Sequence, residues 1–156
     1  QLDRFLLKIE MGYPVREDEI QILTRFRSHD PLENLEPVVD GEMILQMRAE
    51  VDQVTVAPAL LGYIADLAQA SRNHQLVRLG ISPRGTLALL RASLAYAYVQ
   101  GRNYVLPDDI KYLFPYVMGH RVILGFEAEL DGRVKSEVLE EILQEVPVPT
   151  EDVLHE

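Results

Sequence analysis

The sequence predicts a mainly α-helical fold, in which a bundle of about four to five helices follows a short strand-and-helix segment. Three observations lead to this prediction. Beyond residue 40, apolar residues recur at spacings of three and four in several segments. Helix-start signals, among them Ser82-Pro83 and Pro107 followed by two aspartates, precede some of these segments. Near the N-terminus, residues 5–13 instead carry large apolar side chains at every second position, which is typical of a strand with one buried face.

The strand predicted at residues 5–13 ends at Pro14, and a helix is predicted over residues 16–28 with carboxylates in its first turn. The apolar residues of this helix step by three: Ile20, Leu23 and Phe26. Residues 29–39 contain two prolines and no periodicity, so we expect a loop and a domain boundary there. Because a single strand is not stable alone, we expect its sheet partners to lie upstream of Gln1, in a longer protein.

The predicted bundle begins with two helices. Asp40 is a suitable N-cap for the first, and Pro58 suits the first position of the second. Residues 54–56 between them are expected to be briefly extended, and residues 72–81 after them to form a loop. The first helix carries Met43, Ile44, Met47 and Val51, and the predicted apolar stripe of the second is Leu60, Leu61, Ile64, Leu67 and Ala68.

The next two helices have clear start signals. Ser82 caps one of them, Pro83 occupies its first position and Gly101 ends it. Its predicted core stripe is Leu87, Leu90, Leu94 and Ala97. The other begins at Pro107, and Pro115 is expected to kink or shorten it. Its inward residues are expected to be Ile110, Leu113 and Val117.

The C-terminal part alternates weakly over residues 121–130, which favours an extended segment. Asp131-Gly132 is then a turn, and a last helix is predicted near residues 136–146. Its apolar residues are Val138, Leu139, Ile142 and Leu143. Pro147 and Pro149 end this helix, and we expect the acidic tail beyond them to be mobile.

Composition excludes several classes of function. The 15 basic against 25 acidic residues give a net charge of -10, which disfavours a nucleic-acid-binding protein. The chain has no cysteine, which fits a reducing, cytoplasmic location and excludes thiolate chemistry. It contains no GxxxxGK[ST] phosphate loop, no apolar run long enough for a membrane span, and no histidine spacing typical of a metal site.

Two arginines stand out as candidate anion-binding residues. Arg84 falls at the second position of the helix opened by Ser82, where a cation opposes the macrodipole at a cost of about 0.3–1 kcal/mol. A phosphate bound at that helix start would remove the cost, whereas a salt bridge to a nearby carboxylate is the alternative. Arg4, beside the predicted strand, can reach a phosphate on a neighbouring molecule as arginine fingers do, pair with its own Asp3, or stay solvated.

The order of several motifs resembles MoxR-type AAA+ ATPases. The segment after the sensor-1 strand of that family is similar to QLDRFLLK at residues 1–8 with MGYP at residues 11–14. The start of its sensor-2 helix is similar to GISPRG at residues 80–85, which runs into LALLRA at residues 87–92. Further landmarks match GRNYV at 101–105, PDDI at 107–110, GHR at 119–121, EAE at 127–129, DG at 131–132 and EVPVP at 145–149.

The resemblance implies that residues 1–39 are the end of an α/β nucleotide-binding core with a hinge, and that residues 40–156 form a helical lid with a short acidic tail. It implies ATP with Mg²⁺ as cofactor, bound mostly by residues upstream of this chain. Arg4 matches the arginine finger, which acts on ATP of the neighbouring subunit, and Arg84 matches the sensor-2 arginine. Ser82 and Pro83 belong to the same nucleotide-binding helix start. His120 and Arg121 match a family landmark without an assigned role, and we expect them to serve structural packing.

The same resemblance implies partners. Neighbouring subunits would form a ring, a hexamer at full length, which remodels client proteins or von Willebrand factor A-type partners in a chaperone-like manner. Two other classes of function stay open from the residues themselves. One is an acidic helical protein-interaction module without nucleotide chemistry. The other is a helix-turn-helix regulator, against which the net charge of -10 counts.

Overall fold

A computed structural model describes residues 2–27 and 30–149 of the chain. The chain forms two compact units, one of residues 9–48 and one that combines the N-terminal residues up to 8 with the residues from 49 on. The domain boundary predicted near residue 39 lies inside the first unit. The division into a nucleotide-binding core and a lid stays a prediction.

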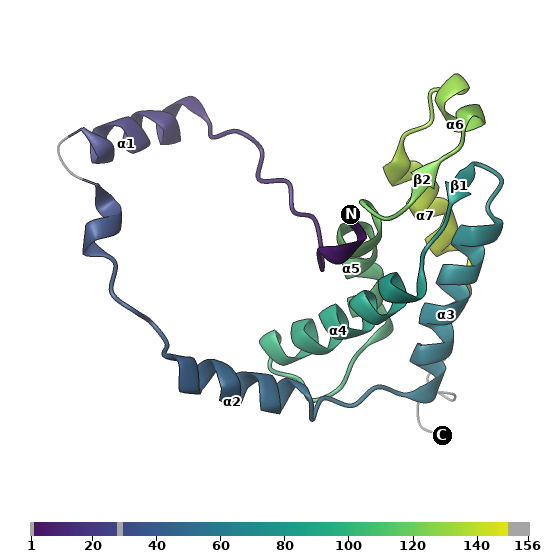
Figure 1. Cartoon of the computed structure of the whole chain (residues 1–156), viewed down its shortest axis with the longest axis horizontal. Helices are drawn as coiled ribbons and strands as arrows, with labels where there is room; N and C mark the ends of the chain where they lie inside the picture. The colour runs from purple at the N-terminus through teal and green to yellow at the C-terminus, as the bar shows by residue number, and fades with distance from the viewer. Residues whose placement is uncertain (1, 28–29, 150–156) are drawn as a thin grey trace. The chain divides into compact units, whose positions relative to one another are not determined.

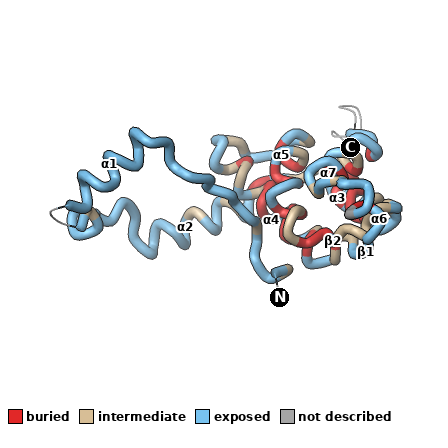
Figure 2. The backbone as a smooth tube through the Cα atoms, turned by 90° about the horizontal axis from the view of Figure 1, so that it is seen from above, coloured by how far each residue is buried: buried red, intermediate tan, exposed pale blue. Residues whose placement is uncertain are grey.

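The unit of residues 9–48 is helical, but none of its described residues, 9–27 and 30–48, is buried (Figure 2). It contains helix α1 (Arg16–Phe26), a 3₁₀ turn at Pro31–Asn34 and most of helix α2 (Gly41–Val51). The predicted helix at 16–28 is thus confirmed over its described length. The predicted loop at 29–39 contains the 3₁₀ turn, and its first residue lies outside the described residues. Asp40 caps α2 as predicted, because its Oδ1 accepts a hydrogen bond of 2.8 Å from the backbone N–H of Met43.

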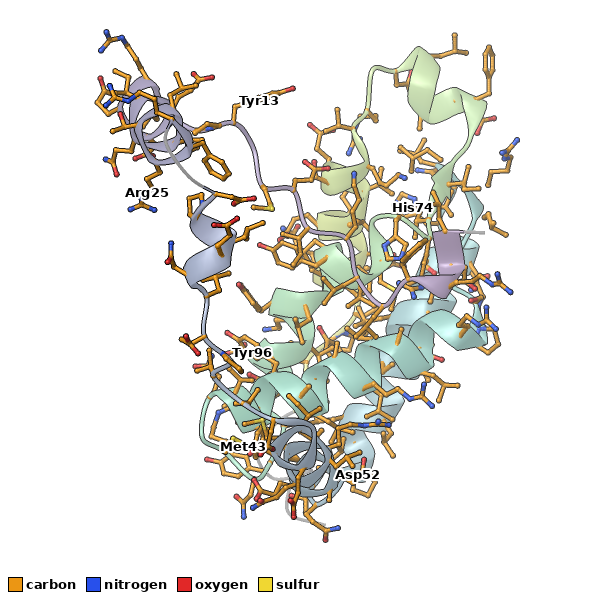
Figure 3. All side chains as sticks on the ribbon, turned by 60° about the vertical axis from the view of Figure 1, so that its left-hand side comes forward. Tyr13, Arg25, Met43, Asp52, His74 and Tyr96 are labelled. Atoms are coloured by element: carbon orange, nitrogen blue, oxygen red, sulfur yellow. The ribbon has the colours of Figure 1, made fainter. Side chains whose placement is uncertain are left out.

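The strand predicted at residues 5–13 is wrong. Leu2–Arg4 form a 3₁₀ turn, and residues 7–15 run without regular structure. Tyr13, labelled in Figure 3, is fully exposed. A strand needs a neighbouring strand to accept and donate its backbone hydrogen bonds, and no described segment pairs with this one. The alternation of apolar residues therefore marks a face that can be buried, of which only Leu7 packs partly against the core, whereas Phe5, Ile9, Met11 and Tyr13 are exposed.

The second unit contains the helical bundle, which confirms the mainly α-helical fold (Figure 1). Its long helices are α3 (Pro58–Asn73), α4 (Pro83–Val99), α5 (Pro107–Met118) and α7 (Lys135–Glu145). Their inward faces share one core, which includes the fully buried Leu60, Leu67, Leu89, Ile110, Phe114 and Ile142. Gly101 ends α4 with a positive φ of 73°, as predicted, since glycine adopts this conformation without a steric penalty.

Two short strands and a short helix complete this unit. Strand β1 (Val77–Leu79) pairs antiparallel with β2 (Ile123–Leu124), so the loop predicted at residues 72–81 is partly wrong. The extended segment predicted at 121–130 is confirmed at β2 alone, because helix α6 (Phe126–Leu130) follows. Strands of two or three residues are too short to show a period of two in the sequence. The turn at Asp131-Gly132 is confirmed, and Gly132 has a positive φ of 65°.

The buried faces of α3 and α4 differ from the predicted stripes. Leu61 and Leu87 are about half exposed, and Tyr63, Ala88 and Ala92 are buried instead. Apolar residues occupy more than one face of these helices, so spacing alone does not select the inward one. Leu90 and Leu94 are half-buried at the margin of the core.

Helix α5 continues through Pro115 to Met118, so the predicted shortening is wrong. The proline removes one backbone donor, but the next turn is intact because the N–H of Gly119 donates to the carbonyl of Pro115 at 2.9 Å. The inward residues predicted for α5 are all buried: Ile110, Leu113 and Val117. In α7, Val138, Leu139 and Ile142 are buried as predicted.

Candidate functional site

A cavity of about 420 Å³ lies where the N-terminal segment meets the start of α4. Four arginines line it against a single aspartate, in a chain whose net charge is -10. Its lining residues are Asp3, Arg4, Leu6, Pro83, Arg84, Leu87, Ala88, Arg91 and Arg121. This concentration of guanidinium groups favours an anionic ligand.

The start of α4 positions Arg84 at this cavity. The hydroxyl of Ser82 accepts a hydrogen bond of 3.2 Å from the N–H of Gly85 and so caps the helix. Pro83 occupies the first position and has no N–H to offer an anion, and the N–H of Gly85 is taken by Ser82, so Arg84 supplies the donors at this helix start. Arg84 is exposed and forms no ion pair with any described residue. The salt bridge considered above for Arg84 is therefore not present in the described part of the chain.

Arg4 lines the same cavity, so the structure brings both predicted arginines together. Its neighbour Asp3 also lines the cavity, but the Asp3 carboxylate accepts from Arg121 Nε at 3.0 Å and from the Ser82 hydroxyl at 3.2 Å. Arg4 is exposed, and it has no carboxylate partner among the described residues. The pairing of Arg4 with its own Asp3 is thus replaced by the contact of Asp3 with Arg121.

Two further arginines line the cavity: the sequence analysis did not propose Arg91 as a site residue, and it noted Arg121 as a family landmark without a role. Arg91 lies two turns after Arg84 on α4, and it is exposed without an ion-pair partner among the described residues. The spacing of seven between these arginines places them on one helix face and was a signal available in the sequence. Arg121 is only 6% exposed. Burial lowers the pKa of its guanidinium, Asp3 opposes this shift, and the positive charge of Arg84 adds to it.

Gly85 and His120 both lie next to Arg121. A Cβ at Gly85 would lie 2.8 Å from Ile81 Cγ2 and 3.2 Å from Arg121 Cδ, so a larger residue would crowd the arginine. His120 Nε2 lies 3.1 Å from the carbonyl of Phe5 and 2.8 Å from Arg121 Nη1. The GHR motif therefore packs the chain after α5 against the N-terminal segment.

Another sequence landmark has a purely structural role. Arg102 forms two hydrogen bonds with the carboxylate of Asp109, at 2.8 and 2.6 Å. The same carboxylate accepts from the N–H of Leu106 at 2.8 Å, which caps α5 from its third position. The motifs at residues 101–105 and 107–110 thus fix the turn between α4 and α5.

The described residues contain neither a metal-binding group of side chains nor a membrane-spanning helix. No group of three or more His, Asp or Glu side chains among them could hold a metal ion. None of the described helices is both long and apolar enough to cross a membrane.

Residues 69–142 match the family model of the AAA lid domain. The matched residues contain α4, α5 and most of α7, so this part of the helical bundle resembles an AAA lid. A crystal structure of a proposed ATPase from Cytophaga hutchinsonii superposes with a TM-score of 0.86 at 30% identity, covering 96% of this chain and 48% of that one.

The curated relatives define the family more narrowly. The chain is 32% identical to Chaperone MoxR1 of Mycobacterium tuberculosis, covering 96% of this chain and 41% of the relative. It is 34% identical to Protein MoxR of Paracoccus denitrificans, covering 94% and 49%. YeaC of Bacillus subtilis is 41% identical, with 97% of this chain and 47% of the relative covered. The chain belongs to the MoxR-type AAA+ proteins and corresponds to their C-terminal part, and it spans about half the length of these relatives.

Proposed function

We propose that this chain is the lid-bearing C-terminal region of an AAA+ protein that hydrolyses ATP. Arg84 contacts the γ-phosphate of the nucleotide bound by its own subunit, and Arg4 acts as an arginine finger. The observation that supports this proposal is the cavity itself: Arg4, Arg84 and Arg91 line it without a carboxylate partner among the described residues. In a chain with an excess of acidic residues, three guanidinium groups around one cavity without such a partner favour an anionic ligand there.

The residues present fit the phosphate part of a nucleotide. ATP bound with Mg²⁺ supplies a phosphoanhydride whose γ-phosphoryl group gains negative charge on its oxygens during transfer. Arg84 binds that group with a forked pair of donors, which orients it and stabilises the developing charge. Ser82 and Pro83 set the position of Arg84 by fixing the first turn of α4. The described residues offer no group of ligands for Mg²⁺, so the metal would be held by the nucleotide-binding core.

The arginines also couple the nucleotide to the position of the lid. While the γ-phosphate is bound, Arg84 attaches the start of α4 to it. When the γ-phosphate leaves, this attachment is lost and the lid is free to rotate about a hinge at residues 29–39. In a ring of subunits, a hexamer in our proposal, this movement would remodel client proteins or von Willebrand factor A-type partners.

The central experiment measures ATP hydrolysis by the ATPase that contains this chain, with Arg84→Ala. We expect kcat to fall about 10²–10³-fold, as for removal of other donors to a developing negative charge, with no change in the melting temperature. Arg78→Ala is the matched control, because Arg78 is an exposed arginine of the same unit that does not line the cavity. If Arg84→Ala hydrolyses ATP at a near-normal rate, the proposed contact of Arg84 with the γ-phosphate is wrong. That result would favour an interaction module without nucleotide chemistry.

A second experiment asks on which subunit Arg4 acts. Arg4 and Arg84 line one cavity of one chain, so both can face the same nucleotide. In a mixed ring, an Arg4→Ala subunit keeps an intact phosphate loop and a phosphate-loop mutant keeps an intact Arg4. If Arg4 acts on the nucleotide of the neighbouring subunit, ATP hydrolysis should return wherever these two intact parts meet. If mixing restores no activity at any ratio, Arg4 serves the nucleotide of its own subunit.

A further inference from the structure

Arg121 makes an unusual set of contacts with the N-terminal segment. Its Nε donates to the Asp3 carboxylate at 3.0 Å, and its Nη2 donates to the backbone carbonyls of Asp3 and Phe5 at 3.2 and 2.6 Å. Its Nη1 donates to the carbonyl of Leu6 at 3.0 Å and to that of Val117 in α5. One buried guanidinium thus binds three carbonyls of a segment more than 110 residues away in the sequence.

The residue enclosed by these contacts is Arg4. The carbonyls on both sides of it, those of Asp3 and Phe5, accept from the same nitrogen of Arg121. The backbone of Arg4 therefore cannot shift or rotate without breaking hydrogen bonds to a charged, desolvated donor. The side chain of Arg4 stays exposed at the cavity. Arg121 itself donates all its bonds to protein acceptors, so it has little capacity left for a ligand.

The same network reaches the helix that carries Arg84. Asp3 joins the two sides, because its carboxylate accepts from Arg121 and from the hydroxyl of Ser82, the N-cap of α4. Arg84 and Arg121 line the same cavity, and the pKa of Arg121 is lowered first by burial and further by the charge of Arg84. One connected set of side chains therefore fixes the backbone of Arg4 and the first turn of α4.

We infer that Arg121 is a positioning residue, which holds the backbone of Arg4 at a fixed place relative to the start of α4. It thereby determines where the guanidinium group of Arg4 can reach a phosphate. This inference rests on the proposed function of Arg4. It differs from a merely structural role of Arg121, in which loss of the side chain would weaken the fold but affect hydrolysis independently of Arg4.

A double-mutant cycle in the complete ATPase distinguishes the two roles. Arg121→Lys keeps the positive charge but loses the forked donor that spans the carbonyls of Asp3 and Phe5. We expect this variant to lower kcat about 10–100-fold, because small displacements of a catalytic group are this costly. In an Arg4→Ala background, Arg121→Lys should change kcat less than about twofold, since the group that it positions is already absent.

Arg102→Lys is the matched control. It alters a second forked arginine–carboxylate pair of the same unit, one that fixes the turn before α5 and does not line the cavity. It should lower the melting temperature without changing kcat. If Arg121→Lys does not fold, Asp3→Ala replaces it, because Asp3→Ala removes the link between Arg121 and Ser82 and should show the same dependence on Arg4.

Four outcomes are possible, of which three overturn the inference and one supports it. An equal fractional loss of kcat with and without Arg4 overturns the positioning role, and so does an unchanged kcat for folded Arg121→Lys. If Arg4→Ala alone leaves kcat unchanged, the proposed finger role of Arg4 fails, and the inference about Arg121 fails with it. A loss confined to the Arg4-containing background supports the inference.

Discussion

The two units of this chain use the same kind of helical pattern with opposite results. In α1, the apolar residues at spacing three are all exposed: Ile20, Leu23 and Phe26. In α5, the corresponding residues are all buried: Ile110, Leu113 and Val117. Both helices begin with acidic first turns, and a helix was predicted at both places, although α5 continues through Pro115. The difference teaches that spacing identifies the face that can be buried, whereas burial itself depends on elements elsewhere in the fold.

The bundle that contains α5 supplies those elements, and the unit of residues 9–48 does not. Each apolar side chain buried in the bundle contributes about 1.5–3 kcal/mol relative to exposure. The exposed side chains of α1 contribute nothing comparable within this chain. We therefore expect the bundle to be stable by itself and the unit of residues 9–48 to depend on further protein surface.

The largest expected difference is between two phenylalanines. Phe114 in α5 is 0% exposed and Phe26 in α1 is 56% exposed. Phe114→Ala should lower the free energy of unfolding by about 3–5 kcal/mol, because it leaves a cavity in the core. Phe26→Ala should change it by less than about 0.5 kcal/mol. Urea unfolding of the chain measures both, and similar losses for the two variants would show that the face of α1 is buried in solution.

The next difference is between two ion pairs. Arg102 and Asp109 form a forked pair in which Asp109 is buried, whereas Arg16 and Glu17 in the other unit are 3.7 Å apart and largely exposed. Arg102→Met should cost about 2 kcal/mol, because it leaves a buried carboxylate without its charged partner. Arg16→Met should stay within about 0.5 kcal/mol. A loss below about 0.5 kcal/mol for Arg102→Met in the same urea titrations would show that the Arg102–Asp109 pair does not stabilise the turn before α5.

A third difference is between two helix caps. Ser82→Ala removes the hydroxyl that caps α4 and also its contact with Asp3, so it should cost about 1 kcal/mol of unfolding free energy. Asp40→Ala removes the cap of α2, an exposed helix, and should fray that helix while leaving the unfolding midpoint of the bundle unchanged. Far-UV circular dichroism detects the fraying and urea unfolding detects the midpoint. A shared midpoint shift would show that the two units unfold together.

Local chemistry made part of this fold predictable. The starts of α4 and α5 follow from Ser82-Pro83 and Pro107, because caps and prolines act within one turn. The strand expected at residues 5–13 was wrong because strands depend on partners that the sequence pattern does not contain. The inward face of α4 was predicted about one position away because leucines surround the helix and the close contacts use alanine.

In the candidate site too, the local features could be predicted from the sequence and the contacts between distant residues could not. The position of Arg84 at a helix start is local, so its charge against the dipole could be noticed in the sequence. The role of Arg121 depends on contacts with Asp3, which lies 118 residues earlier in the chain, and no local pattern predicts them. The family resemblance indicated that the GHR motif matters, but only the hydrogen bonds around Arg4 suggest why.

The smallest expected difference concerns acid sensitivity in the two units. Glu137 in α7 accepts hydrogen bonds from Arg133 and from the N–H of Val134, which lower its pKa below the usual 4.5. A carboxylate with a lowered pKa in the folded state adds stability above its unfolded pKa, and this contribution disappears as pH falls through the folded value. Glu137→Gln should therefore lower the melting temperature slightly at pH 7 and not at pH 3. Glu19→Gln in α1 is the comparison variant, because it removes a carboxylate that has no charged partner among the described residues. A gap for Glu137→Gln that persists at pH 3 would mean that the glutamate acts by packing rather than by charge.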